Sequence, residues 1–134
     1  MRLAILFLVL IFLIDMLGFY IGSYRIPAYD IVLHFFGGFF VAMFFYHYLK
    51  DSIKTGFLKT VLVIVGAAIF IGVIWEFAEY SATKLIGGYL YKKYQIICCI
   101  GNLDDTFNDL AMDILGAITF ILIYVKLFIK HNKA

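Results

Sequence analysis

The chain has 134 residues, of which 65% are hydrophobic and 15% charged, and its formal net charge is +2 at pH 7. This composition excludes an ordinary soluble domain, and the small net charge, carried by scattered basic residues, excludes a nucleic-acid-binding surface. The apolar runs are long enough to cross a bilayer, so the composition predicts a small polytopic membrane protein with one integral domain.

The first two apolar runs predict transmembrane helices at residues 3–22 and 31–48. The first run resembles a signal peptide, but it lacks a small-residue cleavage site and contains Asp15. Between the runs, Pro27 fixes a turn, and Asp30 is placed to cap the second helix. Asp15 lies nearest the middle of the first helix, and two roles stay open for it: a member of an acidic cluster, or a hydrogen-bonded structural acid.

The second half of the chain predicts two more helices, at residues 60–80 and 106–129. The connection between them is the longest in the chain and is rich in tyrosine, which is typical of an interfacial or re-entrant segment. It contains the adjacent pair Cys98 and Cys99, which lacks a metal-binding spacing and is interpreted as two small hydrophobic side chains. The expected fold class is therefore an all-α membrane protein with four transmembrane helices packed as a compact bundle.

The basic residues predict how this bundle is oriented. With the N-terminus on the inner side, seven lysines and arginines lie inside and four lie outside. The positive-inside rule therefore favours an inner-membrane protein with both termini inside. Eight of the nine acids then fall at or beside the outer-facing helix ends, and only Asp51 lies on the inner side.

The last helix opens with a stripe of carboxylates. Asp105, Asp109 and Asp113 recur at every fourth residue, so a helix places them on one face. A charged side chain near the middle of a bilayer-spanning helix costs about 2.5–3.5 kcal/mol on insertion scales. Three on one stripe require a compensating cation, a water-filled cavity or neutralising protons.

Side chains on two other helices can join this stripe in the outer half of the bundle. Asp30 and His34 lie one turn apart on the second helix, and Glu76 and Glu79 lie at the end of the third. Small residues at four-residue spacing lie deeper on the same faces and allow close helix packing, namely Gly38, Ala42, Gly72, Ala68, Gly116 and Ala117. This pattern predicts ionisable groups inside the bundle rather than in lipid.

Simpler roles compete for several of these residues. Asp30 alone is best explained as a helix cap, and Thr106 with Asp109 resembles a capping box. Glu79 can lie among headgroups, and a lone histidine such as His34 is more often structural. Caps and headgroups do not explain Glu76 and Asp113, which lie too deep.

A pocket of carboxylates with one imidazole favours a divalent metal ion as cofactor. The oxygens suit Mg²⁺, Mn²⁺ or Ca²⁺, and His34 makes Zn²⁺ a further candidate. The expected metal ligands are His34, Glu76, Glu79, Asp105, Asp109 and Asp113. The expected catalytic group is His34, Glu76 and Asp109, with Glu76 or His34 as general base.

The reaction favoured by such a site is metal-dependent hydrolysis or phosphoryl transfer on a lipid-linked or envelope substrate. Arg25, Lys84 and Asp30 are then expected near the substrate's headgroup. Two alternatives stay open: a cation or proton pathway or small-molecule-binding protein, which as a four-helix chain would need an oligomer, and a non-catalytic accessory protein whose acids stabilise the fold.

Three motifs together resemble the YjdF-like bacterial inner-membrane proteins and, more loosely, the VanZ-like membrane proteins. They are Asp30-x-x-x-His34-Phe35-x-Gly37-Gly38, Trp75-Glu76-x-x-Glu79 and Asp105-Thr106-x-x-Asp109-Leu110-x-x-Asp113-x-x-Gly116-Ala117. The resemblance covers the second to fourth helices and implies a multi-helix membrane protein with these acids and the histidine as its signature. It implies no particular reaction, and the family usually has more than four helices.

Overall fold

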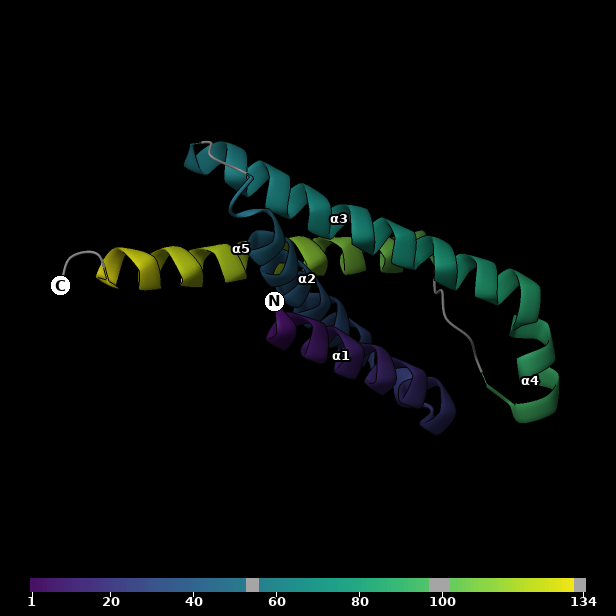
Figure 1. Cartoon of the computed structure of the whole chain (residues 1–134). Coiled ribbons are helices and arrows are strands. Elements are labelled where there is room, and N and C mark those ends of the chain that lie inside the picture. Colours follow the sequence, from purple (N-terminus) through teal and green to yellow (C-terminus); the bar gives the residue numbers. More distant parts are fainter. Residues whose placement is uncertain (53–55, 97–101, 132–134) are drawn as a thin grey trace.

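The computed structural model confirms an all-helical membrane protein. It describes residues 1–52, 56–96 and 102–131 (Figure 1). Within these residues, four helical stretches are long and apolar enough to cross a membrane: Arg2–Ile21, Ala28–Leu49, Phe57–Tyr94 and Leu103–Tyr124. The elements in chain order are α1 (Arg2–Ile21), η1 (Ser23–Arg25), α2 (Pro27–Leu49), α3 (Phe57–Ala82), η2 (Thr83–Gly87), α4 (Gly88–Tyr94) and α5 (Leu103–His131).

The turn between α1 and α2 is tighter than expected. Gly22 ends α1 with a left-handed φ of 75°, and the single 3₁₀ turn η1 leads directly into α2. Pro27 is the first residue of α2, a position where its fixed φ suits a helix and its missing N–H has no intrahelical acceptor. Asp30 therefore lies inside the first turn of α2, and the interpretation of Asp30 as a cap was wrong.

Helix α3 does not end at residue 80 as expected, because the chain stays helical to Tyr94. The stretch η2 has π-helical geometry, and α4 follows it directly. Figure 1 shows α4 bending away from the axis of α3 at the far end of the molecule. The expected long connection is thus helical over much of its length, whereas Cys98 and Cys99 lie outside the described residues.

Helix α5 begins three residues earlier than expected, at Leu103. The side-chain oxygen of Asn102 accepts a hydrogen bond from the backbone N–H of Asp105 at 3.1 Å, which is the geometry of a helix cap. The predicted capping box of Thr106 and Asp109 was therefore wrong, and both side chains are free to face the bundle.

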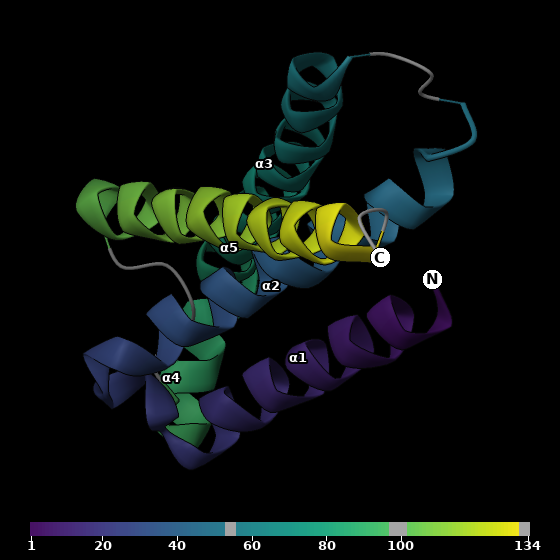
Figure 2. The ribbon, with the colours of Figure 1, turned by 90° about the vertical axis from the view of Figure 1, so that its left-hand side faces the viewer.

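Helices α2 and α5 form the most extensive contact in the molecule, and α3 packs against both. Toward the end of the bundle where α2 ends and α3 begins, they enclose an apolar core of seven buried residues: Val41, Ala42, Ile64, Ala68, Ala117, Phe120 and Ile121. Helix α1 packs on α2, and Figures 1 and 2 show α2 lying between α1 and α3. The contact between α1 and the rest of the bundle is consequently one-sided.

Glycines set the distance between the helices, as the small-residue spacing predicts. A Cβ atom at Gly38 would overlap the backbone of Asp113, and one at Gly116 would overlap the backbone oxygen of Phe35. A Cβ atom at Gly72 would overlap the carboxylate of Asp113. Three helices can therefore approach one another at the level of Asp113 only because these positions lack side chains.

Candidate functional site

The structure gathers its buried ionisable side chains at the end of the bundle where α1 and α3 end and α2 and α5 begin. Among the described residues, the buried ionisable side chains are five acids and one histidine, each at most 6% exposed: Asp15, His34, Glu76, Glu79, Asp109 and Asp113. Asp30 is partly buried beside them. Negative charge is therefore in excess at a depth where an unpaired carboxylate is strongly disfavoured.

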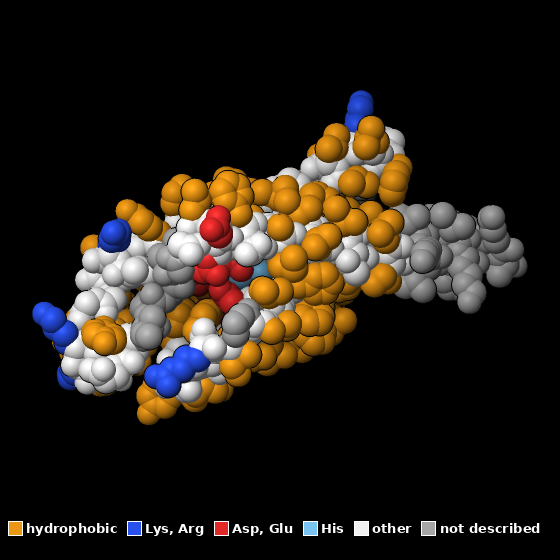
Figure 3. All heavy atoms as spheres, turned by 180° about the vertical axis from the view of Figure 1, so that it is seen from behind, with side chains coloured by type: hydrophobic (Ala, Val, Ile, Leu, Met, Phe, Trp, Pro, Cys, Tyr) orange, Lys and Arg blue, Asp and Glu red, His pale blue; other side chains and the backbone are white. Residues whose placement is uncertain are grey.

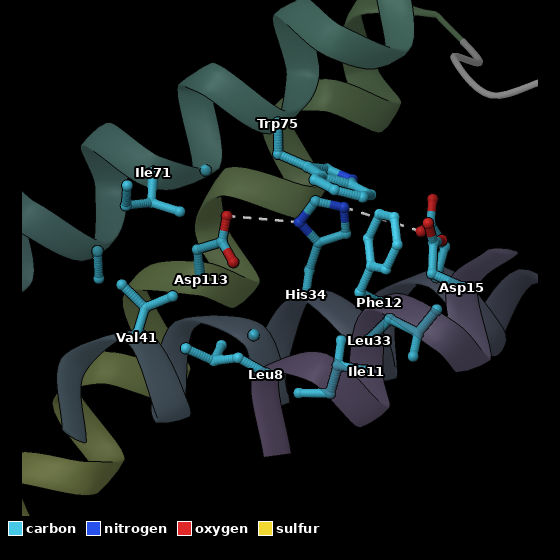
Figure 4. A pocket seen from close by; sticks show the side chains of 14 residues that line it. Leu8, Ile11, Phe12, Asp15, Leu33, His34, Val41, Ile71, Trp75 and Asp113 are labelled. Carbon is cyan, nitrogen blue, oxygen red and sulfur yellow. Dashed lines mark hydrogen bonds and ion pairs between the residues drawn. The ribbon is translucent and has the colours of Figure 1, made fainter. Parts of the chain in front are cut away.

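His34 is the centre of this cluster. Its Nδ1 atom lies 3.4 Å from Oδ2 of Asp113 on α5, within hydrogen-bond distance (Figure 4). Its Nε2 atom lies 3.8 Å from Oδ1 of Asp30 and 3.8 Å from Oε1 of Glu76. One imidazole thus faces carboxylates from three helices, with a close partner on one nitrogen and two more distant acids around the other.

Asp109 completes a group with metal-binding spacing. One ligand atom each from Asp30, His34 and Asp109 can be chosen so that all three lie within 4.8 Å of one another. Asp30 lies in the first turn of α2 and His34 in the next turn. Asp109 lies on α5, which packs against this part of α2. The tight contact of α2 with α5 is what brings the group together.

The two glutamates of α3 have different surroundings. Oε2 of Glu76 accepts a hydrogen bond from the hydroxyl of Thr106 at 2.8 Å, whereas Oε1 has no hydrogen-bond partner among the described residues. Oε1 of Glu79 accepts a hydrogen bond from the indole N–H of Trp75 at 3.1 Å. Glu76 therefore keeps one buried oxygen facing His34, while Glu79 is held to its own helix.

Asp15 is both a bonded acid and a neighbour of the cluster. Its Oδ1 atom accepts a hydrogen bond from the hydroxyl of Tyr24 in η1, and its other oxygen has no hydrogen-bond partner in the described part of the chain. Burial, and then the hydrogen bond to Asp15, raise the pKa of Tyr24 above its ordinary value. Tyr24 is consequently a stable proton donor to Asp15 across the physiological range.

Replacing Tyr24 by phenylalanine is expected to destabilise the protein by about 1–3 kcal/mol, because it leaves a buried carboxylate without its donor. Unfolding in bicelles measures the loss. The contribution of Tyr24 should be complete below its unfolded pKa of about 10 and decrease as the pH rises further, because the unfolded tyrosine then ionises while the folded hydroxyl keeps its proton. The control is Tyr20→Phe, at a position 80% exposed, and an equal loss in both variants would contradict the assignment.

A cavity of about 160 Å³ adjoins the cluster. Asp15, Asp30, His34 and Asp113 line it, and the rest of its wall is almost entirely apolar. Figure 4 shows Leu8 and Phe12 of α1 facing Ile71 and Trp75 of α3 across this space. The cavity thus brings the acidic cluster next to a hydrocarbon-like wall.

The acidic group also reaches the surface. Figure 3 shows acidic side chains gathered in one hollow, with a histidine beside them and with lysines and arginines standing apart on that face. Arg25 and Lys84 are both exposed, and the ammonium of Lys84 lies over the ring of Tyr80 at 5.5 Å from its centroid. No ion pair joins Arg25 or Lys84 to Asp30, Glu76 or Asp113 within the described part of the chain.

The structure brings together most of the residues singled out in the sequence, but several of them have other neighbours than expected. Asp30, expected beside a substrate, lies in the group with His34 and Asp109. Asp113 lies on the opposite nitrogen of His34 from Asp30. Glu79 contacts Trp75, and Asp105 is only partly buried near the start of α5.

Two polar contacts were missed by sequence reasoning. Thr106 was interpreted as a cap although it lies one turn before Asp109 and Leu110 on the face that meets α3. Tyr24 lies nine residues from Asp15, across the helix end, and no periodic pattern connects them. The spacing of Thr106 could have been recognised, whereas the contact of Tyr24 depends on the turn at Gly22.

Comparison with known proteins agrees with this architecture. The chain is 32% identical over 123 residues to a protein of Thermotoga maritima described as "Uncharacterized protein", covering 87% of this chain and 58% of that one. The chain thus spans less than two thirds of the length of this relative. No solved structure matches this chain. A family described as "Predicted membrane protein (DUF2238)" matches residues 1–130, and the chain belongs to this family.

Proposed function

We propose that this protein binds a divalent metal ion at Asp30, His34 and Asp109 and uses it to hydrolyse, or transfer a phosphoryl group from, a lipid-linked phosphate. The observation that supports this most is the convergence of these three side chains from two helices within 4.8 Å. The unpartnered buried oxygen of Glu76 beside His34 is a second, independent indication of a missing ligand.

The donor set fits a hard or borderline divalent ion. Carboxylate oxygens suit Mg²⁺, Mn²⁺ and Ca²⁺, and one imidazole admits Zn²⁺. The three ligand atoms lie within 4.8 Å of one another, and Nε2 of His34 lies 3.8 Å from Oδ1 of Asp30. These spacings are compatible with three ligands around one divalent ion, for which metal–ligand distances are about 2.0–2.6 Å.

Asp113 has the position of an orienting residue. A carboxylate that accepts a hydrogen bond from one ring nitrogen fixes the tautomer of a histidine and leaves the other nitrogen free as a ligand. The contact of Asp113 with Nδ1 assigns Nε2 to the metal side, where Asp30 and Glu76 lie. A bound cation would also offset the excess of buried carboxylates.

A bound divalent ion supplies neutralisation of phosphate charge and a more acidic water. Glu76 has Oε2 held by Thr106, and its Oε1 has no hydrogen-bond partner among the described residues, so this oxygen would be the acceptor for a proton at the site. The apolar wall of the adjoining cavity favours an amphiphilic substrate over a soluble one. Glu76 is the proposed general base, and Asp30, His34 and Asp109 are the proposed ligands.

The packed inner half supports binding rather than conduction. Below the cluster, the core contains Ala42, Ile64 and Ala117 at 0% exposure, without buried ionisable residues among those described at that depth. A proton or cation pathway through one chain needs polar groups or water across the whole bilayer. The outward location of the acids therefore favours a site filled from the outer side.

We place the protein in a cytoplasmic membrane with both termini inside, on the distribution of lysine and arginine. The order of its three motifs supports a YjdF-like identity, with VanZ-like proteins as more distant relatives. The large exposed apolar surface of α1 is compatible with an oligomer. The site itself does not require one.

Metal binding to chelator-treated, purified protein tests the proposal. Wild type should bind Mn²⁺, followed by electron paramagnetic resonance, and Mg²⁺, Ca²⁺ or Zn²⁺ should compete for the same site. Asp109→Asn should weaken binding by more than about 100-fold, and Asp113→Asn by about 10–100-fold, because Asp113 acts through His34. Phosphate release from a polyprenyl diphosphate then tests the reaction.

The matched control for the metal experiment is Asp104→Asn, which makes the same change on an exposed position of the same helix. It should bind Mn²⁺ like wild type. Absence of binding by wild type for all four ions, or equal affinities in wild type and Asp109→Asn, would refute the metal site.

A further inference from the structure

The interior of the cavity is suited to a hydrocarbon chain. Its walls away from the cluster are formed by aliphatic and aromatic side chains of α1, α2 and α3, including Leu8, Ile11, Val41 and Ile71. Its volume of about 160 Å³ is close to that of an apolar protein cavity of about 150 Å³ that admits benzene. A space of this volume accommodates a short segment of one hydrocarbon chain.

Ionisable residues also line this space. Asp15, Asp30, His34 and Asp113 lie in its wall together with the apolar residues, and Figure 4 shows His34 between Asp113 and Asp15. A ligand that fills it must therefore be polar where it meets His34 and apolar elsewhere, which is the pattern of a lipid whose headgroup lies at the cluster. A wholly apolar ligand would leave the polar part of the wall without a partner.

The side of the cavity between α1 and α3 is closed by side chains alone. No backbone contact joins α1 to α3 within the described residues, and both helices pack on α2 instead. Phe12 and Trp75 bridge the gap with ring centroids 6.1 Å apart in an edge-to-face arrangement. Phe12 is 48% exposed, so it can move without disturbing the core.

A second apolar hollow lies beside the cavity, between α1 and α2. It is lined by Ile5, Leu8, Val9, Phe12 and Phe44 and shares Leu8 and Phe12 with the cavity. These residues lie on spans that cross the bilayer, so lipid tails are the medium at this face. Phe12 therefore lies at the boundary between the cavity and the hydrocarbon of the membrane.

We propose that the cavity binds the single hydrocarbon chain of the substrate lipid, which enters sideways from the bilayer between α1 and α3 past Phe12 and Trp75. This inference rests on the proposed function only in taking the headgroup to be a phosphate. Phe12 and Trp75 act as a lateral gate, and the acid cluster fixes the depth of the headgroup.

Trp75 gives this proposal a direct probe, because it is the one tryptophan of the chain and it lines the cavity. Bromine atoms quench tryptophan fluorescence on contact. The probe is dodecanol carrying two bromine atoms at mid-chain, added to protein in micelles without metal. Wild type should show saturable quenching of Trp75, because the chain reaches the ring inside the cavity.

The double variant Leu8→Phe with Ile71→Phe fills the cavity, and Leu6→Phe with Ile74→Phe makes the same changes on lipid-facing positions of the same helices. The added rings of Leu8→Phe with Ile71→Phe should displace about two methylene groups of the probe, which should weaken its apparent affinity about tenfold. The second pair should behave like wild type. Equal quenching in all three proteins would overturn the proposal.

Phe12→Ala tests the route of entry independently of the variant with the filled cavity. Truncating the exposed gate should speed the onset of quenching in stopped-flow mixing without lowering its extent. An onset unchanged from wild type would show that the chain does not pass Phe12.

A phosphate version of the probe separates this proposal from the metal site. In wild type, Mn²⁺ should tighten the binding of brominated dodecyl phosphate and leave the binding of the alcohol unchanged. In Asp109→Asn, Mn²⁺ should change the binding of neither probe. Cavity-dependent quenching by the alcohol without any effect of Mn²⁺ on the phosphate would support the chain site and contradict the proposed function. An effect of Mn²⁺ on the phosphate without cavity-dependent quenching by the alcohol would support the metal site and refute the chain site.

Discussion

Replacing His34 by alanine is expected to destabilise the protein by about 3–5 kcal/mol, because it removes the imidazole that lies among the buried acids. Asp113 would lose its hydrogen-bond partner, and Asp30 and Glu76 would lose the ring that lies between them. The free energy of unfolding in bicelles measures the loss. Acidic pH should restore part of it, since protonated carboxyls no longer repel one another.

The control for this prediction is His47→Ala, on the same helix near its other end. His47 is partly exposed and its ring contacts the neighbouring ring of Tyr46, so its removal breaks no buried charge pair. A loss no larger in His34→Ala than in His47→Ala would show that the cluster does not depend on the imidazole for its stability.

Gly116→Leu is expected to prevent α5 from docking on α2. A Cβ atom at Gly116 already overlaps the backbone oxygen of Phe35 and comes within 2.8 Å of the backbone nitrogen of Phe39. Backbone atoms cannot rotate away as a side chain can, so the cost should exceed the usual overpacking loss of about 1–3 kcal/mol. Size-exclusion chromatography and thermal unfolding should show aggregated or unfolded protein.

The matched control is Gly66→Leu on α3, where an added Cβ atom meets nothing within 4 Å. This variant should fold like wild type, because position 66 is exposed to lipid. If Gly116→Leu folds as well as Gly66→Leu, the close approach of α2 and α5 at Asp113 is incorrect.

Much of the fold was predictable because lipid demands it. Four apolar runs predicted four spans, since a chain in a bilayer must satisfy its backbone hydrogen bonds within each helix. The helix ends were less accurate. Pro27 was taken to fix a turn but begins α2, and the polar segment after residue 80 was taken for a connection but stays helical. Polar composition at a membrane surface does not distinguish helix from loop.

The clustering of the acids was also predictable in part. Helical spacing places Asp109 and Asp113 on one face and Asp30 with His34 on another, and deep acids must face the interior. Which acid lies at which nitrogen of His34 depends on the rotation of α2 against α5. That rotation is set by Gly38 and Gly116, and sequence spacing alone cannot give it at atomic resolution.

Helices α2 and α5, which share the closest interface, are also the two least hydrophobic of the four spans. Each is therefore a weak substrate for insertion by the translocon until its polar face is covered. His34 and Asp113 are 79 residues apart, so at about 5–20 residues per second the ribosome needs roughly 4–16 s to deliver the partner. During biogenesis His34 therefore waits for that interval before the carboxylate of Asp113 can reach it.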